Sequence, residues 1–177
     1  MRHIRTRLYK PNTHSNPMII YRPAEINDLK TLRKIEQQVV LAERPFNAEI
    51  KTGAPLYYDI ENLIASDDTF MLIGESADEI IATGYAQIIV SKGSLQHRKH
   101  AYLGFMYVAE SYRGQGLNGK IIEKLNTWCL EQGIRDCYLD VYSANAQAIR
   151  AYEKLGFESS MIKMKVKLKP SEETQSA

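Results

Sequence analysis

Hydrophobic positions in the first third of the chain predict a strand, a long helix and a short helix. Residues 18–22 form a short apolar run closed by a proline, which is typical of a first or edge strand. Asn27 is a suitable N-cap for the long helix, which should end at the Arg44-Pro45 break. The apolar positions of this helix recur at spacings of three and four: Leu29, Leu32, Ile35 and Val39. Two prolines and a glycine then predict a loop over residues 43–55, before a short helix over residues 57–65.

The middle of the chain predicts three strands. Residues 69–75 and 80–91 are apolar, β-branched runs on either side of the turn-like residues 76–79, so together they predict an antiparallel hairpin. A basic connection follows, and its composition predicts a solvated loop: Lys92, His97, Arg98, Lys99 and His100. Residues 101–108 then form the third apolar run and the third predicted strand.

The second half predicts helix, strand, helix and strand in that order. An amphipathic helix should run from Leu117 to about Gly133, with apolar residues at spacings of four, four and three: Leu117, Ile121, Leu125 and Trp128. Residues 137–142 alternate as a strand does, and a second helical face ends near Gly156. Residues 162–168 alternate apolar side chains with lysines and predict a last strand. This order predicts a mixed α/β sheet with one strand-helix-strand crossover, in its second half.

Composition predicts a single globular domain and gives no indication of a nucleic-acid or membrane partner, but it does not indicate a function. The 177 residues are 44% hydrophobic and 25% charged, which suits one globular domain over residues 18–169. Residues 1–17 should form a basic arm without the apolar core of a secretory signal, and residues 170–177 a polar tail. A net charge of only +2 gives no electrostatic reason to expect a nucleic-acid or membrane partner, and no apolar stretch reaches the length of a membrane span.

Cysteine and histidine usage points to a reducing compartment and to no metal site. Cys129 and Cys137 lack C-x-x-C spacing and are too few for a disulfide framework, so we expect a cytoplasmic protein. None of the four histidines lies in a metal-binding pattern, and we expect them at the surface. Because the alternating residues 162–168 would suit pairing between two copies, a monomer and a homodimer both stay open.

The most informative motif lies between a predicted strand and a predicted helix. Residues 112–120 are Tyr-Arg-Gly-Gln-Gly-Leu-Asn-Gly-Lys. Glycines let a backbone turn sharply and approach a ligand, and a helix N-terminus offers free N–H donors and the positive end of its dipole to phosphate oxygens. The segment therefore predicts a phosphate-binding loop.

Two nucleotide-binding interpretations of this loop fail on neighbouring residues. Gly114, Gly116 and Gly119 spell the G-x-G-x-x-G of dinucleotide-binding folds, but five residues separate the first glycine from the strand. Only 58 residues follow Gly119 (177 minus 119), which is too few for the rest of a doubly wound sheet. The same stretch spells the start of G-x-x-x-x-G-K-[ST], but Ile121 stands where nucleotide hydrolases need a hydroxyl for Mg²⁺.

A second motif decides between these alternatives. Residues 145–157 are Asn-Ala-Gln-Ala-Ile-Arg-Ala-Tyr-Glu-Lys-Leu-Gly-Phe, which resembles the N-x-x-A-x-x-x-Y-x-K-x-G-F segment of the GNAT superfamily of N-acetyltransferases. Residues 113–118 resemble the R/Q-x-x-G-x-G/A pyrophosphate loop of that superfamily, although Asn118 replaces its last small residue. The resemblance implies the GNAT fold, a mixed central sheet with splayed parallel strands and flanking helices. It also implies transfer of an acetyl group from acetyl-CoA to an amine.

The resemblance assigns most of the site to backbone groups. In that superfamily the strands matching residues 101–108 and 136–142 part, and the pantetheine arm inserts between them as an added strand would. The implied cofactor-binding residues are Met106, Tyr107, Val108, Arg113, Gly114, Gln115, Gly116, Leu117, Asn118, Gly119, Lys120 and Asn145. A backbone N–H near Val108 would stabilise the oxyanion, and Tyr152 would be the catalytic acid that protonates the leaving thiolate. Tyr152 also fits an apolar helical stripe, and Asn145 also fits a helix cap.

The general base is not evident in the sequence. An alkyl amine is protonated at pH 7 and must lose a proton before it attacks. Many GNAT enzymes carry a carboxylate on the strand before the loop, but residues 103–108 contain no acid. Glu43, Asp140, Tyr142 and a water chain are the candidates, with the acceptor expected over the polar, aromatic loop of residues 43–58. The missing acid also leaves open an acceptor of low pKa, or an acetyl-CoA sensor without turnover.

Overall fold

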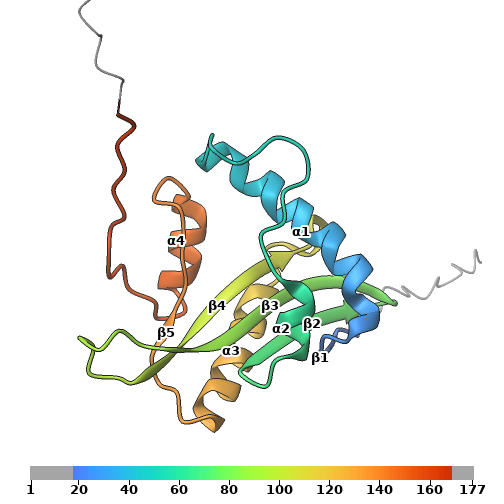
Figure 1. Cartoon of the computed structure of the whole chain (residues 1–177). Helices are drawn as coiled ribbons and strands as arrows, with labels where there is room; N and C mark the ends of the chain where they lie inside the picture. Colours follow the sequence, from blue (N-terminus) through green and yellow to red (C-terminus); the bar gives the residue numbers. More distant parts are fainter. Residues whose placement is uncertain (1–17, 169–177) are drawn as a thin grey trace, which may run out of the picture. The chain divides into compact units, whose positions relative to one another are not determined.

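A five-stranded mixed sheet dominates the computed structural model, which describes residues 18–168. Its strands lie side by side in chain order; β1 to β4 pair antiparallel, and β5 joins β4 in parallel (Figure 1). Their bounds are β1 Ile20–Pro23, β2 Thr69–Ser76, β3 Glu79–Val90, β4 Lys99–Val108 and β5 Cys137–Tyr138. The mixed sheet and its single parallel crossover confirm the predicted fold class. The predictions for residues 1–17 and 170–177 fall outside the described residues.

Helices cover both faces of this sheet. Their bounds are α1 Leu29–Glu43, α2 Ile60–Ala65, α3 Leu117–Glu131 and α4 Ala146–Glu153, with short 3-10 turns η1 Ile26–Asp28, η2 Arg44–Phe46 and η3 Glu110–Tyr112. Helices α1 and α2 lie on one face and α3 lies on the other (Figure 1). By its contacts the chain divides after Tyr142, so that α4 belongs to a second unit that begins at Ser143.

The main core lies between the sheet and the helices α1 and α2. Leu32 and Ile60 are fully buried there, and each contributes about 2 kcal/mol through its transfer from water. From the strands, alternate residues reach the same core, including Met71, Ile73 and Tyr85. The spacing of apolar residues in α1 thus identified its buried side correctly.

The predicted hairpin is confirmed, and its turn has a clear cause. Strands β2 and β3 pair antiparallel, with Ser76 opposite Glu79. The two residues between them, Ala77 and Asp78, have φ angles of 49° and 63°. Two consecutive left-handed residues match the twist of adjacent strands, which is why hairpins favour this kind of turn.

A bulge in β4 changes which side chains share a face. Thr83 lies opposite Tyr107, but Tyr85 lies opposite Gly104, so β4 contains one residue more than β3 between these pairs. Phe105 takes up the extra residue with a φ of 54°, at a cost of about 1 kcal/mol. The buried Thr83 hydroxyl donates a 2.7 Å hydrogen bond to the Phe105 carbonyl and holds the bulge in place.

Strands β4 and β5 part almost as soon as they meet. Their pairing is limited to Ala101 opposite Cys137 and Tyr102 opposite Tyr138. Beyond that point, and within the part of the chain that the structure describes, residues 103–108 pair with β3 on one side only. The splayed parallel strands predicted from the family resemblance are therefore present, and they leave an open backbone edge on β4.

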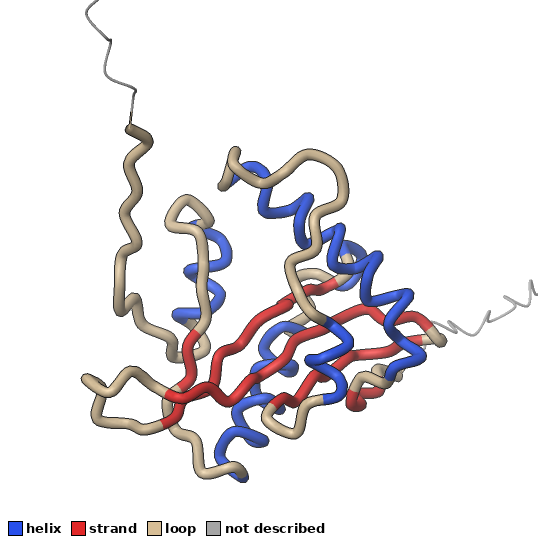
Figure 2. The backbone as a smooth tube through the Cα atoms, in the orientation of Figure 1, coloured by secondary structure: helices blue, strands red, loops and turns tan. Residues whose placement is uncertain are grey.

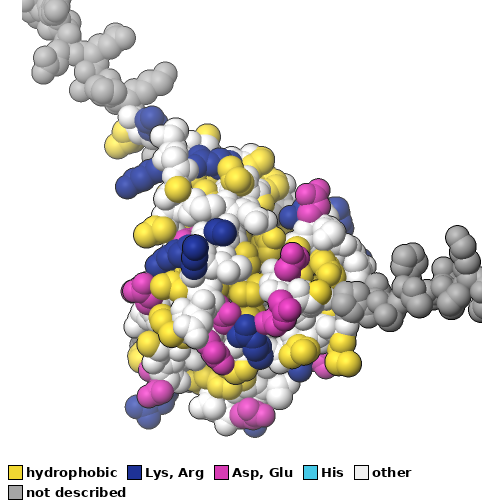
Figure 3. Space-filling view, turned by 90° about the vertical axis from the view of Figure 1, so that its right-hand side faces the viewer, with side chains coloured by type: hydrophobic (Ala, Val, Ile, Leu, Met, Phe, Trp, Pro, Cys, Tyr) yellow, Lys and Arg dark blue, Asp and Glu magenta, His cyan; other side chains and the backbone are white. Residues whose placement is uncertain are grey.

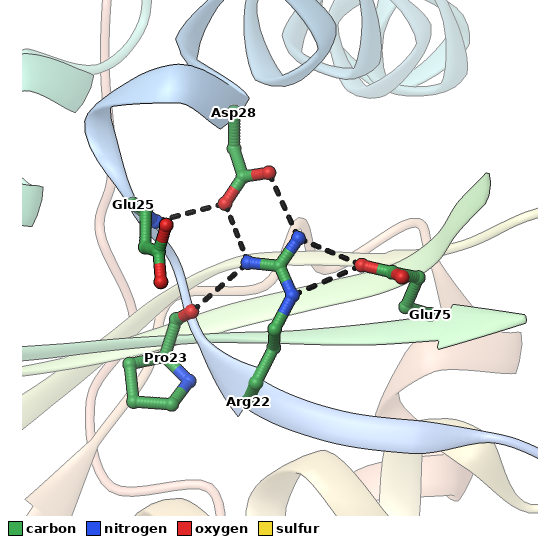
Figure 4. A network of polar contacts seen from close by, with 5 residues as sticks. All are labelled: Arg22, Pro23, Glu25, Asp28 and Glu75. Carbon is green, nitrogen blue, oxygen red and sulfur yellow. Dashed lines mark hydrogen bonds and ion pairs between the residues drawn. The ribbon is translucent and has the colours of Figure 1, made fainter. Parts of the chain in front are cut away.

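An arginine ties the start of the chain's first helix to the sheet (Figure 4). The Arg22 guanidinium donates to both carboxylate oxygens of Asp28, at 2.8 and 3.0 Å, and to Glu75 at 2.7 Å. This pairing holds the pKa of the Asp28 carboxyl below its usual value. Since the three residues come from β1, η1 and β2, the contact fixes how α1 begins over the sheet.

Some predicted boundaries were wrong. Asn27 is not the N-cap, because Glu25 and Asp28 form a capping box and open the helix with the turn η1. The short helix begins at Ile60, with Asp59 as its N-cap, and not at residue 57. The strand predicted for residues 137–142 is only two residues long, since it leaves the sheet where β4 turns away from it.

The last predicted strand is absent. Residues 162–168 have no regular secondary structure (Figure 2). Their apolar side chains are more than four-fifths exposed: Ile162 84%, Met164 89%, Val166 81% and Leu168 82%. Alternation predicts a strand only if a neighbouring strand accepts its hydrogen bonds and a layer covers its apolar face. Within residues 143–168, the described part of the second unit, neither is present for them.

Candidate active site

Two left-handed glycines shape the loop between β4 and α3. Gly114 and Gly116 have φ angles of 77° and 81°. A Cβ built at either position would meet nothing within 4 Å, so backbone conformation and not crowding is what requires glycine there. In contrast, Gly119 lies inside α3, so it does not contribute to the turn.

The N-terminus of α3 has no side-chain cap. The N-cap residue is Gly116, and no side chain there accepts the first N–H groups of the helix. This helix is 15 residues long, so free donors and the positive end of its dipole coincide at Leu117 and Asn118. Asn118, which replaces the last small residue of the family pattern, lies in the first turn of α3 and needs no left-handed angles. The geometry suits an anionic group such as a phosphate.

Polar side chains of this loop contact the loop itself or its neighbours. Arg113 donates through Nε to the Val108 carbonyl at 3.3 Å, and Gln115 donates to the Ser111 carbonyl at 3.2 Å. Lys120 pairs with Glu123 at 2.7 Å. All three side chains are exposed, so they are accessible to a ligand and do not form the turn.

The open edge of β4 is joined to this loop by the short turn η3. Met106 points to the α3 side, where its sulfur would lie 2.9 Å from a Cβ at Gly84. Tyr107 lies on the α1 side and donates its hydroxyl hydrogen to Gln38 at 2.6 Å. The bulge thus places Tyr107 on the same face as Tyr102. Because the side chains of Met106 and Tyr107 point to the two faces of the sheet, the edge itself offers mainly backbone N–H and C=O groups.

Asn145 and Tyr152 belong to the second unit. The Asn145 side chain accepts a 3.1 Å hydrogen bond from the Ala148 N–H, so it is the N-cap of α4. The Tyr152 ring packs edge-on against Phe157, with centroids 5.9 Å apart. The cap and the aromatic contact fit the structural interpretations of these residues. Their roles toward acetyl-CoA stay predictions.

Tyrosines and two carboxylates gather on the α1 side of the sheet. We call this group the aromatic–acidic cluster: Glu43, Tyr57, Tyr58, Tyr85, Tyr102, Asp140 and Tyr142. Tyr58 stacks on Phe105 with centroids 4.6 Å apart and meets Tyr85 edge-on at 6.0 Å. Tyr102 donates its hydroxyl hydrogen to Asp140 at 3.2 Å. Tyr142 stacks on Phe46 and accepts a 3.1 Å hydrogen bond from Asn47.

The cluster shifts the acidity of its own members. Burial raises the pKa of the Glu43 carboxyl, and a hydrogen bond from Tyr57 partly opposes this. Burial, followed by the charge of Glu43, raises the pKa of Tyr57 to about 12. The pKa values of Tyr58 and Tyr102 are raised for the same first reason. Perturbed groups gathered in this way are typical of functional sites.

Side chains of α1 and of the turn η2 hold the loop that carries Tyr57 and Tyr58 of the cluster. The fully buried Glu36 accepts from the backbone N–H groups of Tyr57 and Tyr58, at 2.7 and 2.8 Å, and from Arg33 at 3.2 Å. Arg44 donates to three loop carbonyls: Ile50 at 3.3 Å, Lys51 at 2.9 Å and Gly53 at 3.0 Å. Buried backbone groups of an irregular loop need such partners.

Two histidines of the basic connection are not simple surface residues. His100 contacts Ser91 at 2.8 Å and packs edge-on against Tyr138, while His97 lies 3.8 Å from Asp136. The predicted loop ends at residue 98, because Lys99 and His100 belong to β4, and the ring of Tyr138 in β5 packs against both histidines. Among the residues that the structure describes, no group of three His, Cys, Asp or Glu is placed to hold a metal ion.

The surface seen in Figure 3 mixes both signs of charge. Lysines and arginines alternate there with aspartates and glutamates, separated by apolar side chains. No helix within residues 18–168 is long and apolar enough to cross a membrane.

Comparison with known proteins identifies the family. A sequence model of the acetyltransferase (GNAT) family matches residues 36–157, which include the glycine loop, β4 and the second motif. The chain belongs to the GNAT acetyltransferase family. It is therefore an acyltransferase that depends on acetyl-CoA, as the two motifs implied. This GNAT enzyme is 30% identical to thialysine N-epsilon-acetyltransferase of Bos taurus over 131 residues, which cover 74% of this chain and 73% of the relative.

Further relatives and solved structures agree with this assignment. The enzyme is 30% identical over 100 residues to acetyltransferase SG1711 of Sodalis glossinidius, covering 56% of this chain and 65% of the relative. A structure of the BH1408 protein from Bacillus halodurans has a TM-score of 0.76 at 22% identity and covers 84% of this chain and 99% of its own. A predicted acetyltransferase with acetyl-CoA from Clostridium acetobutylicum has a TM-score of 0.67 at 21% identity, with coverage of 85% and 96%. Both structures share the fold.

Proposed function

We propose that this GNAT enzyme transfers the acetyl group of acetyl-CoA to a primary amine at the end of a flexible, cationic small molecule. The observation that carries the proposal is the open edge of β4. This edge runs from the aromatic–acidic cluster at Tyr102 to the uncapped start of α3, so it joins a site suited to an amine with a site suited to a phosphate.

The cofactor side of the proposal uses mainly backbone groups. The diphosphate of acetyl-CoA would accept from the N–H groups of residues 114–119, since the Lys120 N–H already donates to the Gly116 carbonyl. The exposed side chains of Lys120 and Arg113 would add charge-assisted contacts, with Arg113 turning from the Val108 carbonyl. The pantetheine arm would pair with residues 106–108, and Asn145 would bond to it in addition to capping α4. Two cysteines without C-x-x-C spacing are too few for a disulfide framework, which supports a reducing compartment such as the cytoplasm.

The acceptor side uses side chains. Two carboxylates among tyrosine rings suit an ammonium group on an alkyl chain, because carboxylates pair with the charge and aromatic faces attract it. The half-buried Glu43 is the group that we assign to binding this charge. The relatives named thialysine N-epsilon-acetyltransferase support an acceptor of the N-epsilon amine type.

The reaction is a direct transfer. The neutral amine attacks the thioester carbonyl carbon, the new C–N bond forms, and the C–S bond breaks. A backbone N–H near Val108 stabilises the oxyanion, and the Tyr152 hydroxyl supplies the proton that the leaving thiolate gains. The nitrogen loses one proton as the sulfur gains one, so the step is balanced.

Release of the CoA thiol tests the proposal. The purified full chain is mixed with acetyl-CoA and with thialysine, lysine, diamines, polyamines, neutral amino acids or peptide N-termini. We expect turnover on a cationic, flexible amine and little turnover on neutral acceptors. Tight binding of acetyl-CoA by calorimetry without turnover on any amine would favour the sensor hypothesis instead. No binding of CoA or acetyl-CoA would refute the cofactor site itself.

A further inference from the structure

The hydroxyl of Tyr85 occupies the space above Gly104. The two residues are cross-strand partners in β3 and β4. A Cβ built at Gly104 would lie 2.5 Å from the Tyr85 hydroxyl oxygen and 2.6 Å from its ring carbon Cζ. Any side chain at residue 104 would therefore displace the phenol. The tyrosine fills the place in which a side chain of residue 104 would otherwise stand.

This place is the fork between the parting strands. The last residue of β4 that pairs with β5 is Tyr102, and Gly104 is the next residue on the same face. The open edge begins at residue 103, so the Tyr85 hydroxyl lies at its start. If the pantetheine arm follows this edge, as the proposed function requires, the acceptor amine must approach the thioester along this face.

The phenol is held in position. Tyr85 is only 6% exposed, with Gly104 beneath the hydroxyl end of its ring and the edge of Tyr58 against it at 6.0 Å. Tyr58 is itself stacked on Phe105, the bulge residue. A ring fixed in this way keeps its hydroxyl in one place, which is what a group that orients a reactant needs.

The carboxylate of Asp140 lies beside the neighbouring tyrosine of this face. Tyr102 precedes Gly104 by two residues and lies on the same face as Tyr85. The Tyr102 hydroxyl donates to the exposed Asp140 at 3.2 Å. Three oxygen-bearing side chains from β3, β4 and the segment after β5 therefore form a row. Its outer end is in contact with water, so a proton taken up there can leave.

We propose that the Tyr85 hydroxyl accepts a hydrogen bond from the attacking amine and that Asp140, held by Tyr102, takes up the proton that the ammonium group must lose. This inference rests on the proposed function. The N–H bond of the ammonium breaks, its proton moves to the Asp140 carboxylate directly or through the two phenols, and the nitrogen keeps the electron pair for attack on the carbonyl carbon. Tyr85 and Asp140 thus replace the acid that residues 103–108 lack.

The surrounding groups fit this division of roles. The titratable groups that face Tyr85 are Tyr58, Tyr102 and Asp140, and Glu43 acts on Tyr58 and Tyr102 from the end of α1. Burial and then the charge of Asp140 raise the pKa of Tyr85, so the phenol stays protonated and can pass a proton on but cannot be the final base. Asp140 is the only carboxylate of the row, so it is the member assigned to hold the proton.

The test compares Tyr85→Phe with a matched variant elsewhere in the same sheet. Tyr21 of β1 lies opposite Gly74, and its ring would be 3.2 Å from a Cβ there, so Tyr21→Phe also removes a hydroxyl from a tyrosine packed over glycine. We expect Tyr85→Phe to lower kcat about tenfold, with the KM for acetyl-CoA changed less than twofold, while Tyr21→Phe leaves both unchanged. Asp140→Asn should lower kcat about 100-fold and move the rising limb of the pH profile to higher pH.

Folding and function are separable in this test. Phe keeps the ring packing at residue 85, so the thermal midpoint should stay within a few degrees; a large drop would show that the hydroxyl is structural and would contradict the proposal. Full activity of Tyr85→Phe or Asp140→Asn with an unchanged pH profile would overturn it while leaving the proposed function intact. No thiol release by the wild-type enzyme with any amine would instead be a failure of the proposed function.

Discussion

The glycine loop and the aromatic–acidic cluster are built in opposite ways. The loop takes its shape from two glycines and offers backbone N–H groups at the start of α3, while its polar side chains are exposed. The cluster draws side chains from α1, the following loop, β3, β4 and the segment after β5, and its shape depends on their packing. Ligand binding at the loop should therefore depend on backbone conformation, and ligand binding at the cluster should depend on which side chains are present.

Substitution of the buried Glu36 should have the largest effect, because this carboxylate holds the loop that carries Tyr57 and Tyr58. Glu36→Ala leaves the N–H groups of Tyr57 and Tyr58 without their acceptor and removes the ion pair with Arg33, which keeps only the Tyr58 carbonyl, so we expect the free energy of unfolding in urea to fall by about 3–5 kcal/mol. Acetyl-CoA binding by the remaining folded protein should persist. Glu123 forms a similar pair with Lys120 three residues away, but at the surface, so Glu123→Ala should change stability little. Equal losses in the two variants would contradict the assignment.

Gly116 tests the backbone region. Gly116→Glu puts a side chain on a left-handed residue and a negative charge beside the free N–H groups, so the Kd for acetyl-CoA should rise about 100-fold or more by calorimetry. Gly133 has a φ of 75° just after the same helix and is equally uncrowded. Gly133→Glu is therefore the control, and a similar loss of binding there would mean that helix stability, not the anion site, was measured.

Glu43 should separate acceptor binding from cofactor binding. Glu43→Gln removes the charge that we assign to the acceptor, so the acceptor KM should rise about tenfold while the KM for acetyl-CoA changes less than twofold. Because burial raises the pKa of Glu43 above its usual 4.5, ionisation costs stability as pH rises through the folded value. The Gln variant should lose less stability between pH 4.5 and 7 than the wild type. A steeper loss of stability in the Gln variant than in the wild type would show that the pKa of Glu43 is lowered on folding, not raised.

The smallest effects should come from polar side chains of the glycine loop. Gln115→Ala removes one exposed hydrogen bond to Ser111, and Asn118→Ala changes a helical residue without a special conformation. Each should change the Kd for acetyl-CoA by about twofold or less, because the donors at this site are main-chain groups. A tenfold change in either would show that side chains, too, bind the diphosphate.

The same contrast explains what the sequence could predict. Residues 113–118 are contiguous, and glycine is the one residue type that adopts left-handed angles freely, so the loop and its helix were visible as a motif. Tyr85 and Tyr102 lie opposite Gly104 and Gln87, so they are diagonal neighbours that only the register of β3 and β4 brings together. The bulge at Phe105 was not predicted from any residue type either. Glu43 and Asp140 were named as candidates, and Glu43 was expected in the same loop as Tyr57 and Tyr58, but nothing in the sequence linked either acid to Tyr85 or Tyr102. The strands predicted for residues 137–142 and 162–168 were wrong in length and in existence, respectively. A strand forms only beside a neighbouring strand, and the local pattern of residues does not show whether such a neighbour is present.

The extra residue at Phe105 sets the phase of β4. Before it, Tyr102 and Gly104 share the side that faces α1; after it, Tyr107 returns to that side when strict alternation would have turned it toward α3. A single insertion or deletion within this strand would therefore exchange the two sides of its last residues. The length of β4 is thus under a tighter constraint than its composition, and related chains should vary there by substitution far more readily than by a change in length.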